Sequence, residues 1–499
     1  MELQFQSDSC RCLKAVTRDV REMELTQEVR LSDGMPDIGR VLASWGQVVL
    51  RSKEWQADLI TVSGGIMVWV LYAPEDGTPP RCVDAWVPFQ LKWELPVTEK
   101  EGPVRVWPLL RFADSRNVSA RKIMIRAGIA AMAEALSPLQ TQIYHPSELP
   151  EDICLLKNTY PVRMAKEAGE KTFLLDEDVQ IPAGYAQPER LLAYTVQPQI
   201  YEKRITGDKL VIRGGGKLWV VYRCSEGKVH TAELEILLAQ YAQLEGSYEN
   251  DAQADVMMGV TGLELIHNEG SQLRMKCGMV AQYLITDRHL VEVTEDAYSP
   301  SREVQLHTEE LELPSILEQR AETLQASQQI PGVDGEVAAV SFLPDFPRQN
   351  RAGDQMTLDL SGQFQLVYYA ADGSLQGTTT RWESTMQLLA DPECRMSFLV
   401  QPSGNVQAAA GADGLTVNGQ VKLDMNTQTQ TKIPMVTTLE AGQHTEANPN
   451  RPSLILCRCE GDRLWDLAKR CGSTTEEIIR INRLDGQPRP EQMLLIPIL

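Results

Sequence analysis

The chain carries one pattern of hydrophobic and polar positions three times. In each copy a pair of small residues opens a run rich in Val, Trp, Tyr and Leu, and the run ends in an acidic residue followed by glycine. The three runs align without a gap at residues 62–77, 212–227 and 358–373. β-Branched and aromatic residues favour strands, and an acidic residue before glycine suits the positive φ of a hairpin turn. The pattern therefore predicts a β-hairpin with a buried aromatic face at the centre of each copy.

The repeat has a period of about 150 residues, because Tyr72, Tyr222 and Tyr368 occupy the same position of the three runs. One hydrophobic core rarely grows past about 250–300 residues, so a chain of 499 residues is expected to form several domains. We expect a mainly β protein with three tandem, related antiparallel domains. The predicted units are an N-terminal segment at 1–21, repeats at 22–182, 183–315 and 328–439, polar connectors at 316–327 and 440–452, and a module at 453–499.

The stretch after each hairpin is patterned less clearly. Residues 119–136 alternate at period two but are also rich in alanine, which suits both a strand and a helix. Residues 272–285 alternate more like a strand, as do residues 414–424, where Asn418-Gly419 predicts a turn. Because related copies should share one structure, we expect strands in all three places.

The last 50 or so residues follow a different pattern. Residues 454–459 are typical of a strand, and Leu464, Leu467 and Ala468 then lie on one face of a helix. A capping box formed by Thr474 and Glu477 begins a second helix, and residues 493–497 are typical of a closing strand. The order predicted for this module is β-α-α-β.

The module resembles the LysM family. The matching residues are Gly461-Asp462, the run 464–468, Ile478, Asn482 and 495–497. The resemblance implies binding of chains that contain N-acetylglucosamine, through the loop after the first strand and the loop before the last. The positions that would bind a glycan or another partner in these loops are Gly461, Asp462, Arg463, Leu464, Leu484, Asp485, Gly486 and Gln487.

Two departures from the LysM pattern lie near this groove. Arg463 stands where the family usually has a small hydroxyl residue, and Glu491 stands where it usually has the glycine of a Pro-Gly-Gln turn. Both substitutions place long, charged groups beside the sugar site, so a protein partner competes with a glycan as the expected ligand. Trp465 lies between the core positions of the first helix. We expect it to be partly buried and to anchor a protein interface beside Arg463, since Trp and Arg dominate such contacts.

The repeats resemble the SPOCS domain of spore-coat morphogenetic proteins. The resemblance is carried by residues 29–32 and 36–41, by the hairpins that run from a glycine pair to a tyrosine, and by residues 119–123. Several such domains followed by one LysM module is the layout of the SipL-like proteins of clostridial spore formers. It implies a scaffold in the cytoplasm of the mother cell, at the forespore surface. There the LysM module would help to bind the ATPase that polymerises as the basement layer of the coat. Peptidoglycan binding is the alternative function.

The charge and the termini narrow the classes of function. A formal net charge of −20 disfavours nucleic acid and anionic lipid as partners. The N-terminus lacks a basic start followed by an apolar run, and no apolar stretch reaches the ~20 residues that span a bilayer. We therefore expect a cytoplasmic protein whose ten cysteines stay reduced.

Motifs for catalysis or cofactor binding are missing from the sequence. It contains no H-E-x-x-H zinc site, no G-x-S-x-G elbow and no complete phosphate-binding loop, although Gly214 to Lys217 comes nearest to one. The six histidines are scattered, and the spacing of Cys457, Cys459 and Cys471 matches no common zinc pattern. We expect no enzymatic activity, cofactor or metal site. The recurring Trp69, Trp86, Trp219 and Trp382 are expected in the core rather than in a carbohydrate groove.

Overall fold

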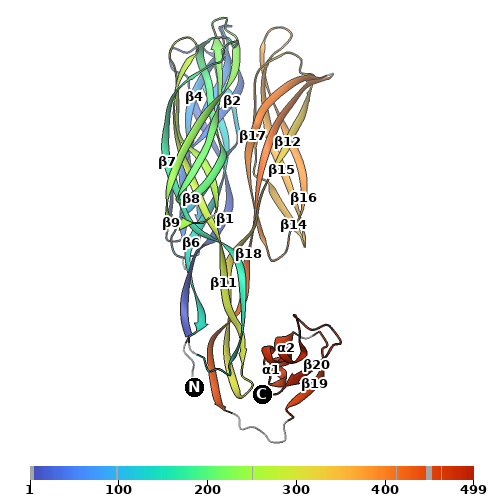
Figure 1. Cartoon of the computed structure of the whole chain (residues 1–499). Helices are drawn as coiled ribbons and strands as arrows, with labels where there is room; N and C mark the ends of the chain where they lie inside the picture. Colours follow the sequence, from blue (N-terminus) through green and yellow to red (C-terminus); the bar gives the residue numbers. More distant parts are fainter. Residues whose placement is uncertain are drawn as a thin grey trace.

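The computed structural model describes residues 5–499 except 97–98, 148, 250, 412, 445–451 and 462. The described chain is almost entirely β, with two short helices near the C-terminus (Figure 1). The first repeat contains β1 (Phe5–Arg30), β2 (Ile38–Gln56), β3 (Leu59–Pro74), β4 (Arg81–Glu94), β5 (Val104–Ser119) and β6 (Lys122–Pro146). The second contains β7 (Cys154–Gln180), β8 (Pro188–Cys224), β9 (Val229–Tyr248), β10 (Gln253–His267) and β11 (Gln272–Tyr298).

The third repeat and the C-terminal module complete the chain. The third repeat contains β12 (Arg302–Pro331), β13 (Glu336–Pro344), β14 (Arg348–Ala352), β15 (Gln355–Tyr369), β16 (Leu375–Leu389), β17 (Arg395–Gly411) and β18 (Gly414–His444). The module contains β19 (Leu454–Arg458), α1 (Leu464–Cys471), α2 (Thr475–Asn482) and β20 (Met493–Pro497). A mainly β fold that ends in a β-α-α-β module is therefore confirmed.

Each repeat pairs its first strand with its last. β1 pairs with β6, β7 with β11 and β12 with β18, always antiparallel, and the penultimate strand β5, β10 or β17 lies on the other side of the last one. The middle strands form a second sheet: β2-β3-β4, β8-β9, or β13 and β14 with β15 and β16. The three repeats thus share the pairing of their first, last and penultimate strands, whereas their second sheets differ in the number of strands.

The predicted hairpins are the centres of the second sheets. β3 pairs with β4, the end of β8 with β9, and β15 with β16. The glycine after each acidic residue has a positive φ: 73° at Gly77, 84° at Gly227 and 80° at Gly373. Tyr72 and Tyr222 are fully buried, and the Tyr72 hydroxyl donates to the Pro36 carbonyl at 3.0 Å.

The glycine pairs at the start of the hairpins are packing positions in strands. A Cβ at Gly64 would collide with the carbonyl oxygen of Val49 on β2. A Cβ at Gly214 would likewise collide with the carbonyl oxygen of Gln199 in the first half of β8. These glycines let two backbones approach closely, which agrees with a strand role rather than with a phosphate loop.

Several expected boundaries lie inside continuous strands. β1 begins at Phe5, opposite Pro146, so residues 5–21 belong to the first repeat rather than to a separate segment. Residues 316–327, expected as a polar connector, form the middle of β12. Asn418 and Gly419 lie within β18 opposite Ser327 and Ala326, so the turn predicted there was wrong. An antiparallel sheet exposes one polar face to solvent, and the polar residues of that face made these segments look like loops.

The strand assignment of residues 119–136 is confirmed from Lys122 onward, because β6 occupies most of this stretch. Residues 127–137 are buried on both faces, since β6 lies between β1 and β5 and other layers cover it. Small alanines at these positions allow packing on both sides of the strand. Burial on both faces also explains the weak periodicity, because a strand buried on both sides does not alternate polar and apolar residues.

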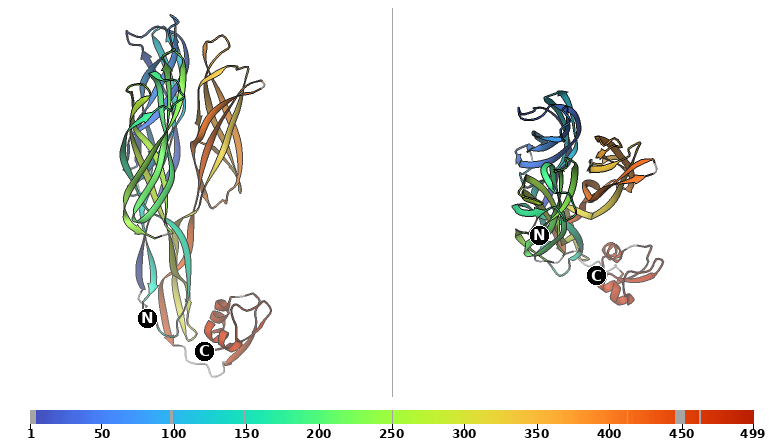
Figure 2. Two further views of the ribbon diagram at one scale, coloured as in Figure 1. Left: turned by 45° about the horizontal axis from the view of Figure 1, so that its top comes forward. Right: turned by 90° about the horizontal axis from the view of Figure 1, so that it is seen from above.

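The three repeats stand side by side and form one elongated body, seen from above as three lobes (Figure 2). Its upper part contains the sheets, and its lower part is a stalk of two-stranded ribbons from β1–β6, β7–β11 and β12–β18 (Figure 1). A shared apolar cluster fills the stalk, with members from all three ribbons: Cys10, Cys12, Ile143, Val162, Met164, Val291, Val293, Leu311, Leu313, Ile433 and Met435. Hydrogen bonds join each pair of repeats: Val196 N to Gln47 Oε1 at 2.8 Å, Trp107 Nε1 to Val400 O at 3.1 Å, and Val229 N to Tyr369 Oη at 2.7 Å.

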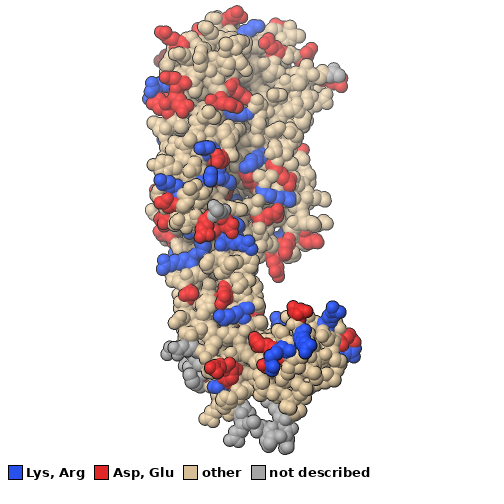
Figure 3. Space-filling model, viewed as in Figure 1, with Lys and Arg blue, Asp and Glu red and all other residues tan. Residues whose placement is uncertain are grey.

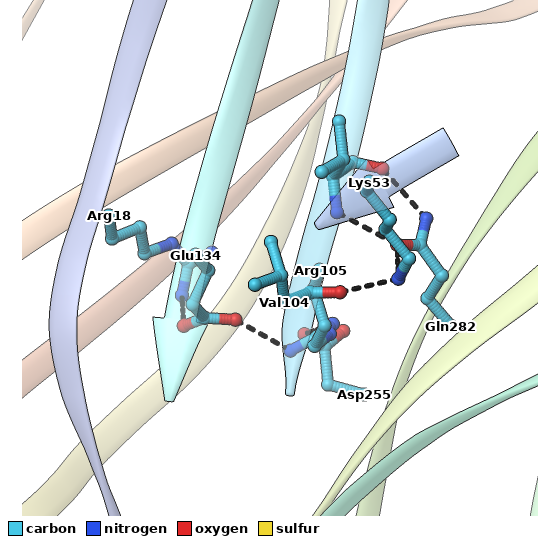
Figure 4. A network of polar contacts seen from close by, with 8 residues as sticks. Arg18, Lys53, Val104, Arg105, Glu134, Asp255 and Gln282 are labelled. Atoms are coloured by element: carbon cyan, nitrogen blue, oxygen red, sulfur yellow. Dashed lines mark hydrogen bonds and ion pairs between the residues drawn. The ribbon is translucent and has the colours of Figure 1, made fainter. Parts of the chain in front are cut away.

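A buried ionic network fastens the first repeat to the second (Figure 4). The Glu134 carboxylate, fully buried, accepts from Arg105 Nη1 at 2.9 Å and from Arg18 Nη1 at 3.2 Å. Arg105 also reaches across the repeats to Asp255 Oδ2 at 2.7 Å. Burial alone would raise the pKa of Asp255, but the charge and hydrogen bond of Arg105 outweigh burial and hold that pKa below its usual range.

Candidate functional site

The C-terminal module is built as its sequence predicts. β19 pairs with β20 in antiparallel register, and Leu464, Leu467 and Ala468 of α1 are buried beneath them. α1 ends at Gly472, whose φ of 64° is the left-handed conformation that commonly terminates helices. The Thr474 hydroxyl accepts from the Glu477 N–H at 3.3 Å and caps α2. The reciprocal half of the predicted capping box is not made, because the Glu477 carboxylate pairs with Arg480.

Asn482 ties α2 to the sheet. Its amide nitrogen donates to the Leu495 carbonyl at 2.6 Å, and its Oδ1 accepts from the Leu495 N–H at 2.8 Å. The side chain therefore takes the place of a neighbouring strand along β20. This contact gives a physical reason for an asparagine at this position of the module.

The two predicted binding loops meet. Gln487 Oε1 accepts from the Leu464 N–H at 3.1 Å, which joins the loop before β20 to the start of α1. Gly461, Arg463 and Gln487 are exposed around this contact, as are Asp485 and Gly486. Leu464 is buried and Leu484 is half-buried. Asp462 lies outside the described residues.

Arg463 is held at the mouth of these loops. Its guanidinium forms an ion pair with Asp466 at 3.0 Å, on the first turn of α1. The hydrogen bond and charge of Arg463 lower the pKa of Asp466. The pair is exposed, so it contributes little to stability, and it presents a planar cation to a partner.

Trp465 does not face solvent; it docks the module onto the lower end of the stalk. Its exposed fraction is 8%, lower than the partial burial expected from the sequence. The indole Nε1 donates to Asp296 Oδ2 of β11 at 2.8 Å, and the ring lies edge-on to Tyr298 with centroids 4.7 Å apart. Lys469, one helical turn further on, bonds both carboxylate oxygens of Asp296 at 2.7 Å. The sequence predicted an anchor for a separate protein at Trp465; in the structure the ring contacts Asp296 and Tyr298 of the same chain, and binding of another protein there stays a prediction.

Tyr298 extends this contact into the core of the module. Its hydroxyl donates to the Ser473 carbonyl at 3.0 Å, and it belongs to the same apolar cluster as Leu464 and Leu467. Burial, reinforced by the nearby Cys154, raises the pKa of the Tyr298 phenol. The sequence analysis did not identify Asp296 and Tyr298 as a docking surface. The only signal is two side chains, one acidic and one aromatic, at the end of a long strand.

Side chains that could support other chemistry are dispersed. Across the described residues, no group of three or more His, Cys, Asp or Glu side chains is arranged to hold a metal ion. Within the same residues, neither helix has the length and apolar character needed to cross a membrane. Acidic and basic side chains are interspersed over the face of the rod in Figure 3, with no continuous basic surface there.

The tryptophans expected in the core divide into two groups. Trp69 and Trp382 are buried and Trp219 is half-buried, as core packing requires. Trp86 is 38% exposed, which contradicts the expectation. Its ring covers Gly65 on the neighbouring strand, and Arg51 lies 5.4 Å from the ring centroid. The indole thus covers a glycine at the surface of the sheet.

Comparison with known proteins decides the nature of the module. A model of the LysM domain family matches residues 460–497. The C-terminal module is a LysM domain. The match spans both helices, β20 and the two loops joined by Gln487 and Leu464. Membership of the LysM family suggests that this domain binds peptidoglycan or related glycans. Searches among curated proteins and among solved structures found no match for this chain.

Proposed function

We propose that the protein is a non-enzymatic scaffold in which a three-repeat β rod presents the LysM domain as a protein-binding module. The observation that carries the proposal is the docking of α1 on the stalk. Trp465 and Lys469 of this LysM domain already bind a carboxylate and a tyrosine on a β ribbon, which are protein groups rather than sugar groups. The exposed Arg463 beside them is better suited to contacting a protein partner than to lining a sugar groove.

The resemblance of the repeats to SPOCS domains extends this proposal to a process. We place the protein in spore-coat assembly, in the cytoplasm of the mother cell at the forespore surface. There it tethers the polymerising ATPase of the coat basement layer through its LysM domain. The rigid rod supports such a role, because hydrogen bonds and the buried Arg105 network lock the repeats together and hold a bound partner at a defined distance.

Glycan binding is the second candidate, and one contact favours it. The bond between Gln487 and Leu464 brings together the two loops that bind N-acetylglucosamine chains in other LysM domains. Gly461 and Gly486 leave open space beside these loops, since a Cβ at either position would meet no atom within 4 Å. This arrangement supports retention of the chain on peptidoglycan.

A two-ligand binding assay separates the candidates. The full-length chain is tested for capture of the purified coat-basement ATPase and for retention on insoluble peptidoglycan, together with Arg463→Ala and Gln487→Ala. The scaffold proposal expects capture of the ATPase that Arg463→Ala weakens at least tenfold, and no specific retention on peptidoglycan. Arg480→Ala is the matched control, because Arg480 is another exposed arginine of the module that pairs with an acid three residues away.

Two outcomes of this assay would decide against the scaffold. One is retention on peptidoglycan that Gln487→Ala abolishes, which would establish the glycan candidate. The other is capture of the ATPase that responds equally to Arg463→Ala and Arg480→Ala, which would remove the proposed interface.

A further inference from the structure

The LysM domain has an apolar face that the contacts described so far do not use. Alternate residues of β19 and β20 point away from the helices, and four of them are large aliphatic side chains exposed to solvent. Their exposed fractions are 46% for Leu454, 59% for Leu456, 51% for Met493 and 38% for Leu495. The inward residues between them, such as Leu494 and Ile496, are fully buried. The outer face of the sheet therefore carries four aliphatic side chains beside the exposed ion pair of Arg458 and Glu491, and the inner face is buried against the helices.

This face lies on the side of the domain away from the stalk. α1 stands between the stalk and the two strands in both side views (Figures 1 and 2). Docking through Trp465 therefore leaves the outer face of β19 and β20 uncovered by the residues that the structure describes.

The backbone of β19 is open along the edge that carries Leu454 and Leu456. Among the described residues, β20 is the neighbouring strand of β19, and the two form a two-stranded sheet. At one end of the strand pair the Ile498 N–H donates to the Ser453 carbonyl at 3.1 Å. At the other end the Cys459 N–H donates to the Gln492 carbonyl at 2.9 Å. In an antiparallel ladder alternate residues bond inward. Leu454 and Leu456 lie between the inward-bonding positions, so their N–H and C=O groups point outward.

The opposite edge of the sheet differs. Leu495 is directly across from Leu456, so its N–H and C=O also point outward, away from β19. Both groups are taken by the side chain of Asn482. One edge of the sheet is thus closed by a side chain, whereas no strand among the described residues pairs with the other edge, beside the exposed leucines.

We propose that the free edge of β19 binds an extended segment of a partner protein as an added strand, with aliphatic residues at alternate positions packing beside Leu454 and Leu456 and extending the apolar face that these form with Leu495 and Met493. This inference deepens the proposed scaffold function and rests on it. The backbone edge supplies hydrogen bonds along the strand, and the apolar face selects side chains at every second position.

The size of the face favours a strand over a second folded copy of the chain. Four side chains that are each about half exposed present on the order of 400 Å² of apolar area, comparable with the largest, often functional, patch of a typical monomer. A stable interface between folded proteins takes about 800 Å² from each partner. An extended peptide needs less area, because it gains main-chain hydrogen bonds at the same time.

The test uses a defined peptide with the full-length chain. The probe is a fluorescein-labelled peptide that alternates Val and Thr over seven residues between terminal lysines, and its binding is followed by fluorescence anisotropy. Leu456→Thr removes the apolar side chain but keeps the N–H, whereas Leu456→Pro also removes the N–H. An outward N–H is the position at which proline is tolerated in an edge strand. Leu237→Thr is the control for Leu456→Thr, because Leu237 is an exposed leucine of β9, in a different sheet.

Strand addition predicts a graded result. Leu456→Thr should weaken binding about tenfold, Leu456→Pro at least a further tenfold, and Leu237→Thr not at all. In the native chain the Leu456 amide should exchange with solvent rapidly when free and at least tenfold more slowly when saturated with peptide.

Three results would overturn the inference: no binding of the probe, equal binding by the native chain and Leu456→Pro, or a Leu456 amide that exchanges equally with and without peptide. Circular dichroism and thermal unfolding of Leu456→Pro check that the domain is folded, and the exchange measurement on the native chain stands without that variant. If Arg463→Ala weakens capture of the ATPase but Leu456→Pro leaves it unchanged, strand addition at β19 is refuted and the proposed scaffold function is still supported.

Discussion

Removing the Asp296 carboxylate should release the LysM domain from the stalk. Asp296 accepts the Trp465 indole N–H at 2.8 Å and pairs with Lys469 at 2.7 Å. A hydrogen bond to a charged group contributes about 1.5–3 kcal/mol, and a solvent-exposed ion pair about 0–1 kcal/mol. The Lys469 side chain is 44% exposed, so its share is taken at the low end. Asp296→Ala should therefore cost the docked state about 2 kcal/mol, a shift of about 30-fold in the docking equilibrium.

Single-molecule energy transfer measures this equilibrium directly. One dye is placed at the exposed Asp485 of the LysM domain and the other at the exposed Glu309 of the stalk. The ratio of docked to undocked molecules is then compared between the native chain and Asp296→Ala. Glu292→Ala is the matched control, because it removes a carboxylate from the same strand that pairs with Lys157 rather than with the LysM domain.

A second variant separates the two contacts. Lys469→Met should shift the docking equilibrium about threefold or less, and it should have no further effect in the Asp296→Ala background. If Asp296→Ala and Glu292→Ala give the same docked fraction as the native chain, the Trp465 contact does not hold the domain, and the reasoning that makes α1 a protein-binding face is refuted.

Three further predictions concern the rod. Arg105→Met should lower the free energy of unfolding by about 3–5 kcal/mol in chemical denaturation, because it leaves the buried Glu134 and the partly buried Asp255 without this partner; a loss below about 1 kcal/mol would contradict a buried network. Because the pKa of Asp255 is lowered in the folded protein, its stabilisation should be complete above pH ~4 and lost as the pH falls through the folded-state pKa. A native chain and an Asp255→Asn variant that lose stability equally between pH 7 and pH 3 would argue against this. Gly64→Ala should cost about 1–3 kcal/mol by calorimetry, because the new methyl group meets the Val49 carbonyl; an unchanged melting temperature would show that β2 yields easily.

Thiol chemistry offers an independent check of the stalk core. Burial, with a smaller contribution from Cys10, raises the pKa of the Cys12 thiol to about 11. At pH 8 almost no thiolate is present, so Cys12 should resist an aromatic disulfide reagent until the chain unfolds. Peptide mass spectrometry after timed labelling measures this. Labelling of Cys12 in the native protein at the rate of an unhindered thiol would mean that the ribbons of the stalk do not pack together.

Local patterns were strong enough to predict the hairpins and the LysM domain. The acidic residue before Gly77 and its counterparts restricted the turn type, because glycine adopts positive φ without steric cost. The spacing of Leu464, Leu467 and Ala468 at one face of a helix likewise predicted α1. These features depend on residues that are close together in the sequence, so the local sequence is enough to predict them.

The ends of the repeats could not be found in this way. The first strand, β1, has its partners 92 (122 − 30) to 141 (146 − 5) residues away in β6, and its exposed face alternates too weakly to be distinguished from a connector. The exposure of Trp86 was missed for a related reason. Its recurrence at a hairpin position identified a structural role, but only the neighbouring strand decided which side of the sheet the ring covers.

The sequence by itself determined a β repeat used three times and a C-terminal β-α-α-β module of LysM type. The tertiary structure decided that first and last strands pair to form the stalk, that the repeats lock through buried charges such as Arg105, and that Trp465 binds Asp296. The physical reason is the distance along the chain between the residues that interact. Turn and helix preferences are set by adjacent residues, whereas pairing of distant strands and the burial of a charge depend on which surfaces the folded chain brings together.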